Sequence, residues 1–165
     1  MIFESSRSAP AGKAVPLLIA GGVLLLAGCS PPPPARLAPP GGPLQPCPST
    51  PNCVSTEASD ARHAMPPLRY TGTPQQAQAH ARAALLADPR TRMVTERPGY
   101  LHAEARSRLF RFVDDVEVMV DSAAGLVRFR SASRVGRGDL GVNRSRMRRF
   151  SARFQAADSA ALHHR

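Results

Sequence analysis

The sequence contains no tryptophan and only two tyrosines, and Lys13 is its single lysine. So few aromatic side chains offer little surface on which bases can stack, which argues against nucleic acid as a partner. The G-x-S-x-G and H-E-x-x-H motifs of hydrolases and zinc peptidases are also missing. No pattern typical of a known catalytic class is present, and we expect no cofactor and no metal ion.

The first 28 residues have the pattern of a signal peptide. Two basic residues precede an apolar run over residues 14–26, which is too short to span a bilayer comfortably. The run ends in the letters LAGC, which resemble the bacterial lipobox, so we expect Cys29 to become the acylated N-terminus. The acyl chains would hold the protein on a membrane without spanning it. A plain secretory signal or an uncleaved anchor is the alternative.

The residue after the expected acylation site is Ser30. In the lipoprotein sorting pattern that this arrangement resembles, an aspartate at that place favours retention in the inner membrane. A serine therefore favours the outer membrane. We expect a lipoprotein of the bacterial cell envelope that faces the periplasm.

A tether is predicted for residues 29–46, because eight of the 17 residues after Cys29 are proline. Such a segment favours extended polyproline II and reaches up to ~50 Å. The chain has 22 basic and 12 acidic residues, and without Arg7, Lys13 and Glu4 of the leader 20 and 11 remain. The mature chain, at +9, is therefore attracted to anionic lipid head groups, and salt weakens the attraction.

Cys47 and Cys53 are the two cysteines that remain beside Cys29. In an oxidising compartment, two cysteines so close in sequence most simply form a local disulfide. A zinc site would need two further ligands, for which His63 is the near candidate, and a redox pair usually has the tighter C-x-x-C spacing. We predict the disulfide, with free thiols, a redox pair and a metal site as alternatives.

Periodicity predicts one globular domain over residues 47–157, followed by a loose tail over residues 158–165. A helix is expected to begin at Pro74, with Thr73 as its N-cap, and to stop at Asp88-Pro89. Four strands are expected at residues 92–97, 100–107, 114–121 and 126–133, and residues 54–70 are expected to be coil.

A second helix is predicted after the last strand, with one apolar stripe that lies on the sheet. The stripe consists of Leu140, Met147, Phe150 and Phe154. The elements then make an α+β fold, a two-layer domain in which a four-stranded antiparallel sheet has two flanking helices.

The last two strands have a definite predicted register. Pairing Val120 with Val127 places Val118 opposite Phe129 and Glu117 opposite Arg130. This register buries one face and makes a cross-strand ion pair on the other.

Several separated motifs carry a resemblance to a known family. They are CP from Cys47, PNCVS over residues 51–55, DDVE over 114–117, SASRVG over 131–136 and DLGVNR over 139–144. Together they resemble the signature of the family catalogued as domain of unknown function 1499, over about residues 47–155. The resemblance implies a domain boundary and brings no activity, because the family is named for its lack of one.

The loop before the final helix is a candidate anion site. Glycines let backbone N–H groups converge, a helix N-terminus carries partial positive charge, and arginines add full charges. The candidate residues are Arg134, Gly136, Arg137, Gly138, Asn143 and Arg144. Asn143 falls on the apolar stripe, so we expect it to point inward and bond a loop carbonyl. In the alternative, structural interpretation, the glycines only make the turn, the arginines pair with acidic residues and Asp139 caps the helix.

Two functions from different classes are compatible with these patterns. The preferred hypothesis is a non-catalytic envelope lipoprotein whose arginine-rich surface binds an anionic lipid, a cell-wall polymer or an acidic protein. The alternative is a hydrolase or metal-dependent enzyme that uses an acidic cluster, Asp114, Asp115, Glu117 and Asp139. Carboxylates beside many arginines are more often neutralised than poised for catalysis, so binding is preferred.

Overall fold

The computed structural model describes residues 36–107 and 112–162. The predicted signal peptide, Cys29 and the first part of the predicted tether lie outside these residues. Within the described ranges, no helix is both long enough and apolar enough to cross a membrane.

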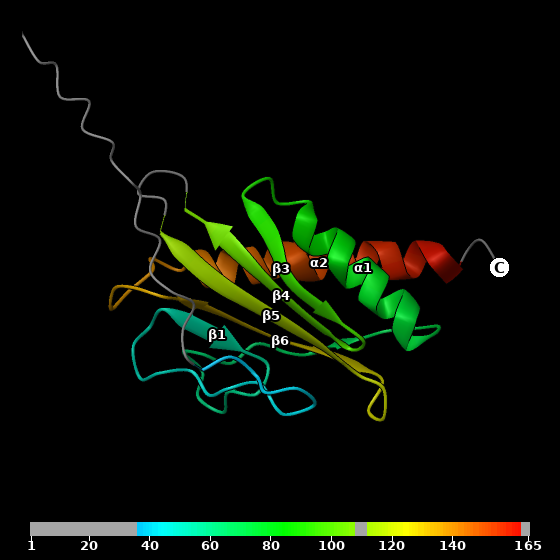
Figure 1. Cartoon of the computed structure of the whole chain (residues 1–165), viewed down its shortest axis with the longest axis horizontal. Coiled ribbons are helices and arrows are strands. Elements are labelled where there is room, and N and C mark those ends of the chain that lie inside the picture. Colours follow the sequence, from blue (N-terminus) through cyan, green and yellow to red (C-terminus); the bar gives the residue numbers. More distant parts are fainter. Residues whose placement is uncertain (1–35, 108–111, 163–165) are drawn as a thin grey trace, which may run out of the picture.

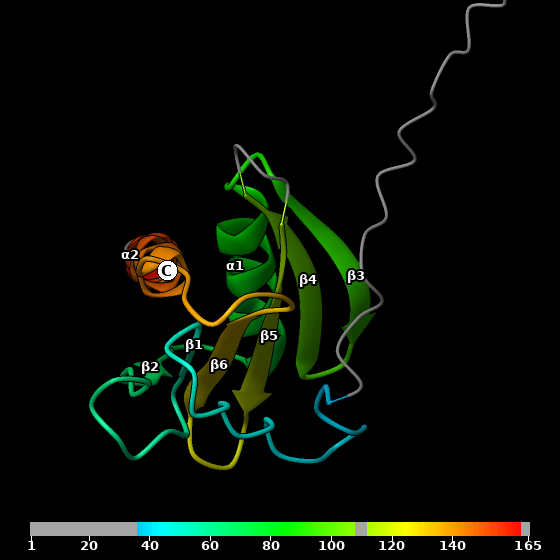
Figure 2. The ribbon, with the colours of Figure 1, turned by 90° about the vertical axis from the view of Figure 1, so that its left-hand side faces the viewer.

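One sheet and two helices form a two-layer α+β domain, which confirms the predicted class (Figure 1). The helices are α1 (Pro74–Leu86) and α2 (Val142–Leu162). The strands are β1 (Cys53–Ser55), β2 (Leu68–Arg69), β3 (Thr91–Arg97), β4 (Tyr100–Arg106), β5 (Val113–Asp121) and β6 (Leu126–Ser133). Their order is β1-β6-β5-β4-β3, and β2 also pairs with β6. Both helices lie on the same side of the sheet, as Figure 2 shows.

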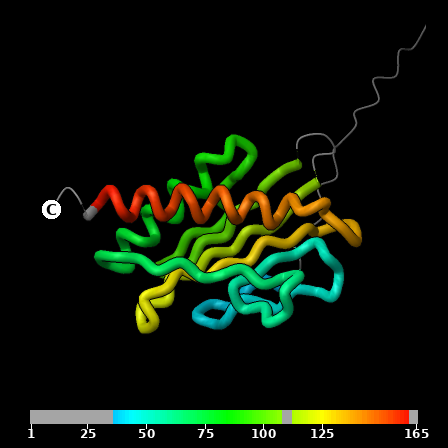
Figure 3. The backbone as a smooth tube through the Cα atoms, turned by 180° about the vertical axis from the view of Figure 1, so that it is seen from behind, coloured from blue at the N-terminus to red at the C-terminus, as the bar shows by residue number. Residues whose placement is uncertain are grey.

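The hydrophobic core lies between the sheet and the two helices. Alternate residues of β4, β5 and β6 point into it, because successive side chains of a strand point to opposite faces. Seen from behind, α2 runs across the strands (Figure 3), and it contributes Met147, Phe150 and Phe154 to the same core. The Phe129 and Phe150 rings meet edge to face, with centroids 5.8 Å apart.

The predicted register of β5 and β6 is confirmed. Val120 pairs with Val127, Val118 with Phe129 and Glu117 with Arg130. The cross-strand ion pair between Arg130 Nη1 and Glu117 Oε2 is present at 3.4 Å. Burial of one face therefore selects the register, since a slip by one residue would place the valines outside the core.

The predicted sheet was too small, because it has six strands and not four. Both additional strands fall in the segment that was expected to be coil, and both pair with β6. At three and two residues they are too short to show an alternating pattern. Their backbone groups nevertheless cover the edge that β6 would otherwise expose.

The beginning of α1 is as predicted. Thr73 accepts a hydrogen bond from the backbone N–H of Gln76, and the Gln76 side chain accepts one from the backbone N–H of Thr73. This capping box and Pro74 in the first turn satisfy or remove free donors at the helix start. The helix buries Ala77, Ala81, Ala84 and Leu85, and their small side chains permit close approach to the sheet.

The prediction that Leu140 lies on the inner stripe of α2 is wrong. The helix begins two residues later, and Leu140 is fully exposed at 104 % with a φ of 52°. Asp139 instead caps the helix, because its carboxylate accepts the N–H groups of Gly141 and Asn143 at 2.9 and 2.8 Å. The cap turns Leu140 out of the core.

The helix also continues to Leu162, through most of the segment predicted to be a loose tail. Asp158 explains the extension, since it is buried and its Oδ2 accepts hydrogen bonds from the backbone N–H and the hydroxyl of Thr71, both at 2.9 Å. The contact ties the last turns of α2 to the segment before α1.

Part of the predicted tether belongs to the fold. Residues 36–46 lie on the side of the sheet opposite the helices, in blue at the lower right of Figure 2. Ala38 and Leu44 are buried against Tyr100, with Met119 packed beside them. The backbone N–H of Ala38 donates to Glu117 Oε1 at 2.7 Å. The described part of the proline-rich segment thus closes the second face of the sheet.

Leu44→Ala tests this packing. Because Leu44 is 3 % exposed, we expect the truncation to lower the free energy of unfolding by about 2 kcal/mol. The same change at the exposed Leu140 is the matched control and should stay within about 0.5 kcal/mol. Urea denaturation measures both, and equal effects at the two positions would contradict the packing of residues 36–46.

Candidate functional site

The face of the sheet away from the helices carries a buried charge network. It consists of Tyr100, His102 and Glu104 on β4, Asp115 and Glu117 on β5, and Arg130 and Arg134 on and just after β6. The β4–β5 register brings the two acidic strands together by pairing His102 with Glu117 and Glu104 with Asp115. Strand alternation places all of these side chains on one face.

Asp115 is the centre of one half of the network. Arg134 donates to both of its oxygens, from Nε to Oδ2 and from Nη2 to Oδ1, each at 2.7 Å. His102 Nε2 lies 2.7 Å from Oδ1. Arg134 also reaches Glu104 Oε1 at 2.6 Å, and Arg92 holds the other Glu104 oxygen at 2.9 Å. The Arg134 side chain is 3 % exposed and that of Asp115 is fully buried.

Glu117 is the centre of the other half. Its Oε1 accepts hydrogen bonds from the Tyr100 hydroxyl at 2.8 Å and from the backbone N–H of Ala38 at 2.7 Å. Its Oε2 faces Arg130. The carboxylate is completely buried, so these three donors replace the water that it loses on folding.

The network holds Asp115 and Glu104 in the charged form. Burial disfavours ionisation of Asp115, but the hydrogen bonds from Arg134 and His102 outweigh it and keep the pKa of Asp115 below its usual value. Glu104 behaves likewise: burial opposes its charge, and Arg134 and Arg92 lower its pKa on balance. The hydrogen bond to Asp115 raises the pKa of Arg134. These are the properties of neutralised ion pairs and not of an acid or base poised near neutral pH.

The predicted acidic cluster is not one site. Asp115 and Glu117 share the network face, whereas Asp114 points to the helix side and binds Arg146 Nη2 at 2.6 Å. Asp139 caps α2. In the part of the chain that the structure describes, no three histidine, cysteine or acidic side chains come together in a way that would hold a metal ion. The arrangement therefore offers no support for the carboxylate-based enzyme.

The predicted anion-site residues are also dispersed. Arg134 belongs to the charge network, and Arg144 donates to the backbone carbonyls of Ala64 and Arg62 at 3.1 and 2.6 Å. Asn143 points inward as predicted, and its Nδ2 donates to the carbonyl of Asn52 at 3.2 Å. Gly136, Arg137 and Gly138 lie on the exposed part of the loop, where Gly136 has a φ of 85°.

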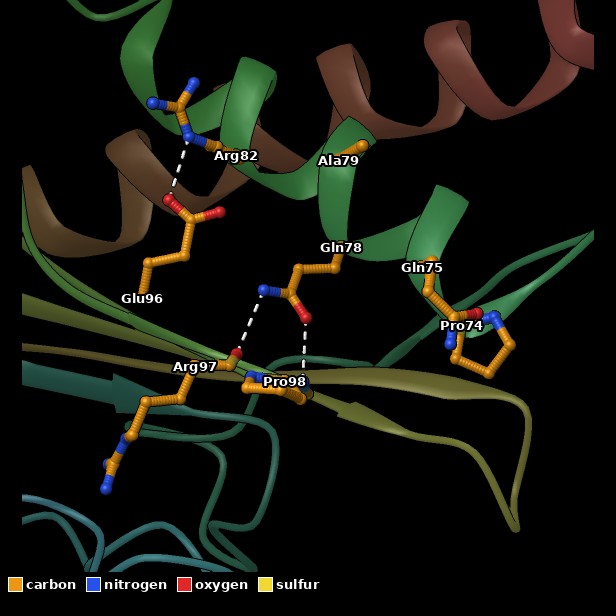
Figure 4. A pocket seen from close by; sticks show the side chains of 9 residues that line it. Pro74, Gln75, Gln78, Ala79, Arg82, Glu96, Arg97 and Pro98 are labelled. Carbon is orange, nitrogen blue, oxygen red and sulfur yellow. Dashed lines mark hydrogen bonds and ion pairs between the residues drawn. The ribbon is translucent and has the colours of Figure 1, made fainter.

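One hollow of the described surface is a groove of about 500 Å³ between α1 and the β3–β4 turn (Figure 4). Gln78 lies across it, donating to the carbonyl of Arg97 at 3.0 Å and accepting the N–H of Gly99 at 2.7 Å. Arg82 and Glu96 form an ion pair at 3.0 Å at one end. These polar groups already bind one another. Their bonds hold the β3–β4 turn against α1, and the groove therefore presents few polar groups to a ligand.

A smaller hollow of about 250 Å³ is rich in arginine. We call it the arginine pocket, and it lies where the end of α1, the end of β4 and the beginning of α2 meet. Its lining residues are Asp88, Arg90, Ala105, Arg106, Ser107, Val142, Ser145, Arg146 and Arg149. Four of these nine are arginines and one is an aspartate. Arg106 follows Glu104 by two positions on β4, so its side chain points to the network face and the guanidinium groups on the pocket side are those of Arg90, Arg146 and Arg149.

The pocket keeps an excess of positive charge after its ion pairs are counted. Asp114 on β5 neutralises Arg146 at 2.6 Å, and Asp88 forms an ion pair with Arg149 at 3.3 Å. Arg106 Nη2 forms an ion pair with Glu104 Oε2 at 3.8 Å, so Arg106 adds no unpaired charge to the pocket. Arg90 uses its Nε to donate to the carbonyl of Arg106. The first turn of α2 adds its partial positive charge on the same side.

The sequence predicted an arginine-rich anion-binding surface, but none of the residues that line this pocket was among the predicted anion-site residues. Arg90 and Arg106 lie 16 positions apart, and Arg149 belongs to a helix 43 positions further on. Strand alternation groups Tyr100, His102 and Glu104 on one face of β4, but only the β4–β5 register links them to Asp115 and Glu117. An arginine at the end of a strand or after a helix gives no signal of its own.

The chain thus folds into a two-layer α+β domain with a buried charge network on the face of the sheet away from the helices. Residues 43–154, more than half of the chain, match the family model described as "Protein of unknown function (DUF1499)". The chain belongs to this family. Comparison with curated proteins and with solved structures returned no match.

Arg134→Gln tests the charge network. Removal of the guanidinium leaves Asp115 buried and short of partners, so we expect a loss of about 3 kcal/mol in the free energy of unfolding at pH 7. Arg137→Gln removes the same charge from the exposed part of the loop and should change stability within about 0.5 kcal/mol. Urea midpoints of both variants measure the difference.

The pH dependence of that loss is a second readout. The pKa values of Asp115 and Glu104 are lowered on folding. Their stabilisation is therefore present above the unfolded values of about 4 and fades as the pH falls below them. The gap between wild type and Arg134→Gln should thus narrow between pH 7 and pH 3. A gap that is constant across this range would show that Arg134 acts by packing and not by charge.

Proposed function

We propose that this protein is a non-catalytic binding module of the bacterial envelope, held to a membrane through acylated Cys29, that binds an anionic group in the arginine pocket. The single observation that carries the binding proposal is the pocket itself, where Arg90, Arg146, Arg149 and one aspartate lie around about 250 Å³. A hollow with more guanidinium groups than carboxylates selects a negatively charged ligand.

The size and chemistry of the pocket favour a small oxyanion. Its volume lies below the ~300–1,000 Å³ of pockets for drug-sized ligands, so it suits a phosphate-sized head group. Guanidinium groups bind phosphate and carboxylate through two parallel hydrogen bonds, which gives geometric specificity as well as charge. Arg146, fixed by Asp114 at 2.6 Å and Asn143 at 2.7 Å, supplies a rigid floor.

The location in the envelope has separate support. The letters LAGC at Cys29 and the preceding apolar run indicate a lipoprotein leader. The Cys47–Cys53 disulfide is present, and such bonds persist in oxidising compartments such as the periplasm. Ser30 after the acylated cysteine favours the outer membrane. A cationic domain on a lipid anchor would therefore work close to a bilayer.

Binding in the pocket predicts that phosphate stabilises the folded protein. At a phosphate concentration ten times the Kd, linkage gives about 1.4 kcal/mol, which should raise the melting temperature by about 4 °C. In Arg90→Gln and Arg149→Gln this rise should fall by at least half. Arg148→Gln is the matched control, because Arg148 is exposed on the same helix and does not line the pocket. Equal phosphate responses in all three variants would contradict the assignment.

The anchor is tested by fatty-acid labelling in a bacterial host. Wild type should incorporate labelled fatty acid, and Cys29→Ser should not. Cys47→Ser also removes a cysteine and should keep the label, since Cys47 belongs to the disulfide. Labelling of Cys29→Ser, or its absence from wild type, would rule out lipidation at Cys29.

A further inference from the structure

We propose that the end of the domain that carries the arginine pocket docks on an anionic bilayer, with Leu140 entering the membrane interface and the pocket receiving a lipid phosphate. The inference rests on the proposed anion-binding function and adds the source of the anion. The shared chemistry is a phosphate group, and what distinguishes a bilayer from a soluble phosphate is an apolar surface beside the pocket.

Exposed apolar residues gather at this end of the molecule. Among the described residues five large hydrophobic side chains are exposed, and four of them are Phe112, Val135, Leu140 and Val142. Val142 lines the pocket itself. The backbone N–H of Arg134 bonds the carbonyl of Val113 at 3.1 Å, so Val135 follows closely on the strand that begins beside Phe112. The fifth residue, Val94, lies on the edge strand β3.

Leu140 is the tip of this apolar surface, and its position is fixed. It is 104 % exposed and adopts a φ of 52°, a conformation that leucine seldom takes. The Asp139 carboxylate accepts hydrogen bonds from the backbone N–H groups of Gly141 and Asn143, just after Leu140. The cap thus holds a leucine in solvent where a polar residue would serve the fold equally well. Several exposed apolar side chains at one end of a molecule, rather than a single one, are a feature of interaction surfaces, and Leu140 lies in the chain between the exposed Val135 and Val142.

Cationic groups surround the apolar tip, which is the pattern of a surface that meets anionic lipid. Arg137 is exposed in the same loop, and Arg90, Arg106 and Arg149 line the pocket next to Val142. A solvated cell-wall polymer or an acidic protein face would be attracted by the arginines but would give Leu140 no apolar environment. The combination favours a bilayer, whose interface offers phosphate and hydrocarbon within a few ångströms.

The position of the anchor is compatible with this orientation. Ala38 is bonded to Glu117 of β5, and the chain from Cys29 to Ala38 spans at most ~30 Å when fully extended. At ~3.4 Å per residue, Glu117 lies ~14 Å along β5 from Val113, which pairs with Arg106 at the pocket end. An acylated Cys29 can therefore lie in the membrane plane that Leu140 would enter.

The absence of tryptophan makes the test direct. Leu140→Trp introduces a single fluorescent reporter at the tip, and Val94→Trp introduces one at the exposed valine on β3 as the matched control. The full chain, purified from a bacterial host, is mixed with vesicles of phosphatidylglycerol and phosphatidylcholine or of phosphatidylcholine alone. We expect Leu140→Trp, but not Val94→Trp, to shift its emission to the blue and to be quenched by brominated lipid in the anionic vesicles.

The pocket is then tested in the same reporter. Because the acyl anchor would keep every variant on the vesicles, the readout is contact of the tip with lipid. Adding Arg90→Gln and Arg149→Gln should reduce the quenching of Leu140→Trp by brominated lipid in anionic vesicles at least threefold, and Arg148→Gln should reduce it less. The docking proposal would be overturned if anionic vesicles changed the emission of Leu140→Trp no more than that of Val94→Trp. This holds even where phosphate still stabilises the protein in the absence of vesicles. Failure of phosphate to stabilise the wild type would instead overturn the proposed function, so the two failures are distinguishable.

Discussion

The buried ion pair between Arg134 and Asp115 is the contact on which the rest of the molecule depends. One guanidinium holds both oxygens of Asp115 and one oxygen of Glu104, and it therefore joins the end of β6 to β5 and β4. Burial of a charge costs several kcal/mol unless its partners are complete, so the three side chains are stable only together. The backbone N–H of Arg134 is also fixed, on the carbonyl of Val113. The loop that leads to α2 thus leaves the sheet from a rigid point, and the arginine pocket inherits its geometry from that point.

Sequence patterns predicted the middle of this fold well because the physics there is local. Alternation along β5 and β6 determined which valines are buried, and burial then determined the register to the residue. Thr73 and Pro74 similarly marked the start of α1. The patterns failed where an element is too short to have a period, as in β1, or where a cap competes with a stripe. Leu140 has the spacing of a core residue, but the Asp139 carboxylate starts the helix after it.

The sequence could not predict which arginines would be buried and which partners each would bind. Arg134, Arg137 and Arg144 lie within eleven positions of one another, yet one is buried between two carboxylates, one is exposed, and one binds two backbone carbonyls. Which of these occurs depends on the residues opposite in space, and those come from β4, β5 and the segment around Ala64. The acidic residues show the same rule, because neighbours in sequence, Asp114 and Asp115, are bound to different arginines on opposite faces of the sheet.

The proline-rich segment links the fold to its attachment. Glu117 has no exposed surface, so its carboxylate requires donors from the protein, and the backbone N–H of Ala38 supplies one of them. Proline has no N–H, and a segment composed of proline alone could not make this bond. The break in the proline run at residues 35–38 is therefore what allows the chain to close the polar face. Because the chain is fixed at Ala38, residues 38–46 cover the sheet and cannot also act as a spacer. If Cys29 is acylated as we propose, the connection between anchor and domain is therefore shorter than the composition of the whole segment suggests. A short connection would restrict how far and at what angles the domain moves from a bilayer, and would favour a surface on the domain that is compatible with lipid.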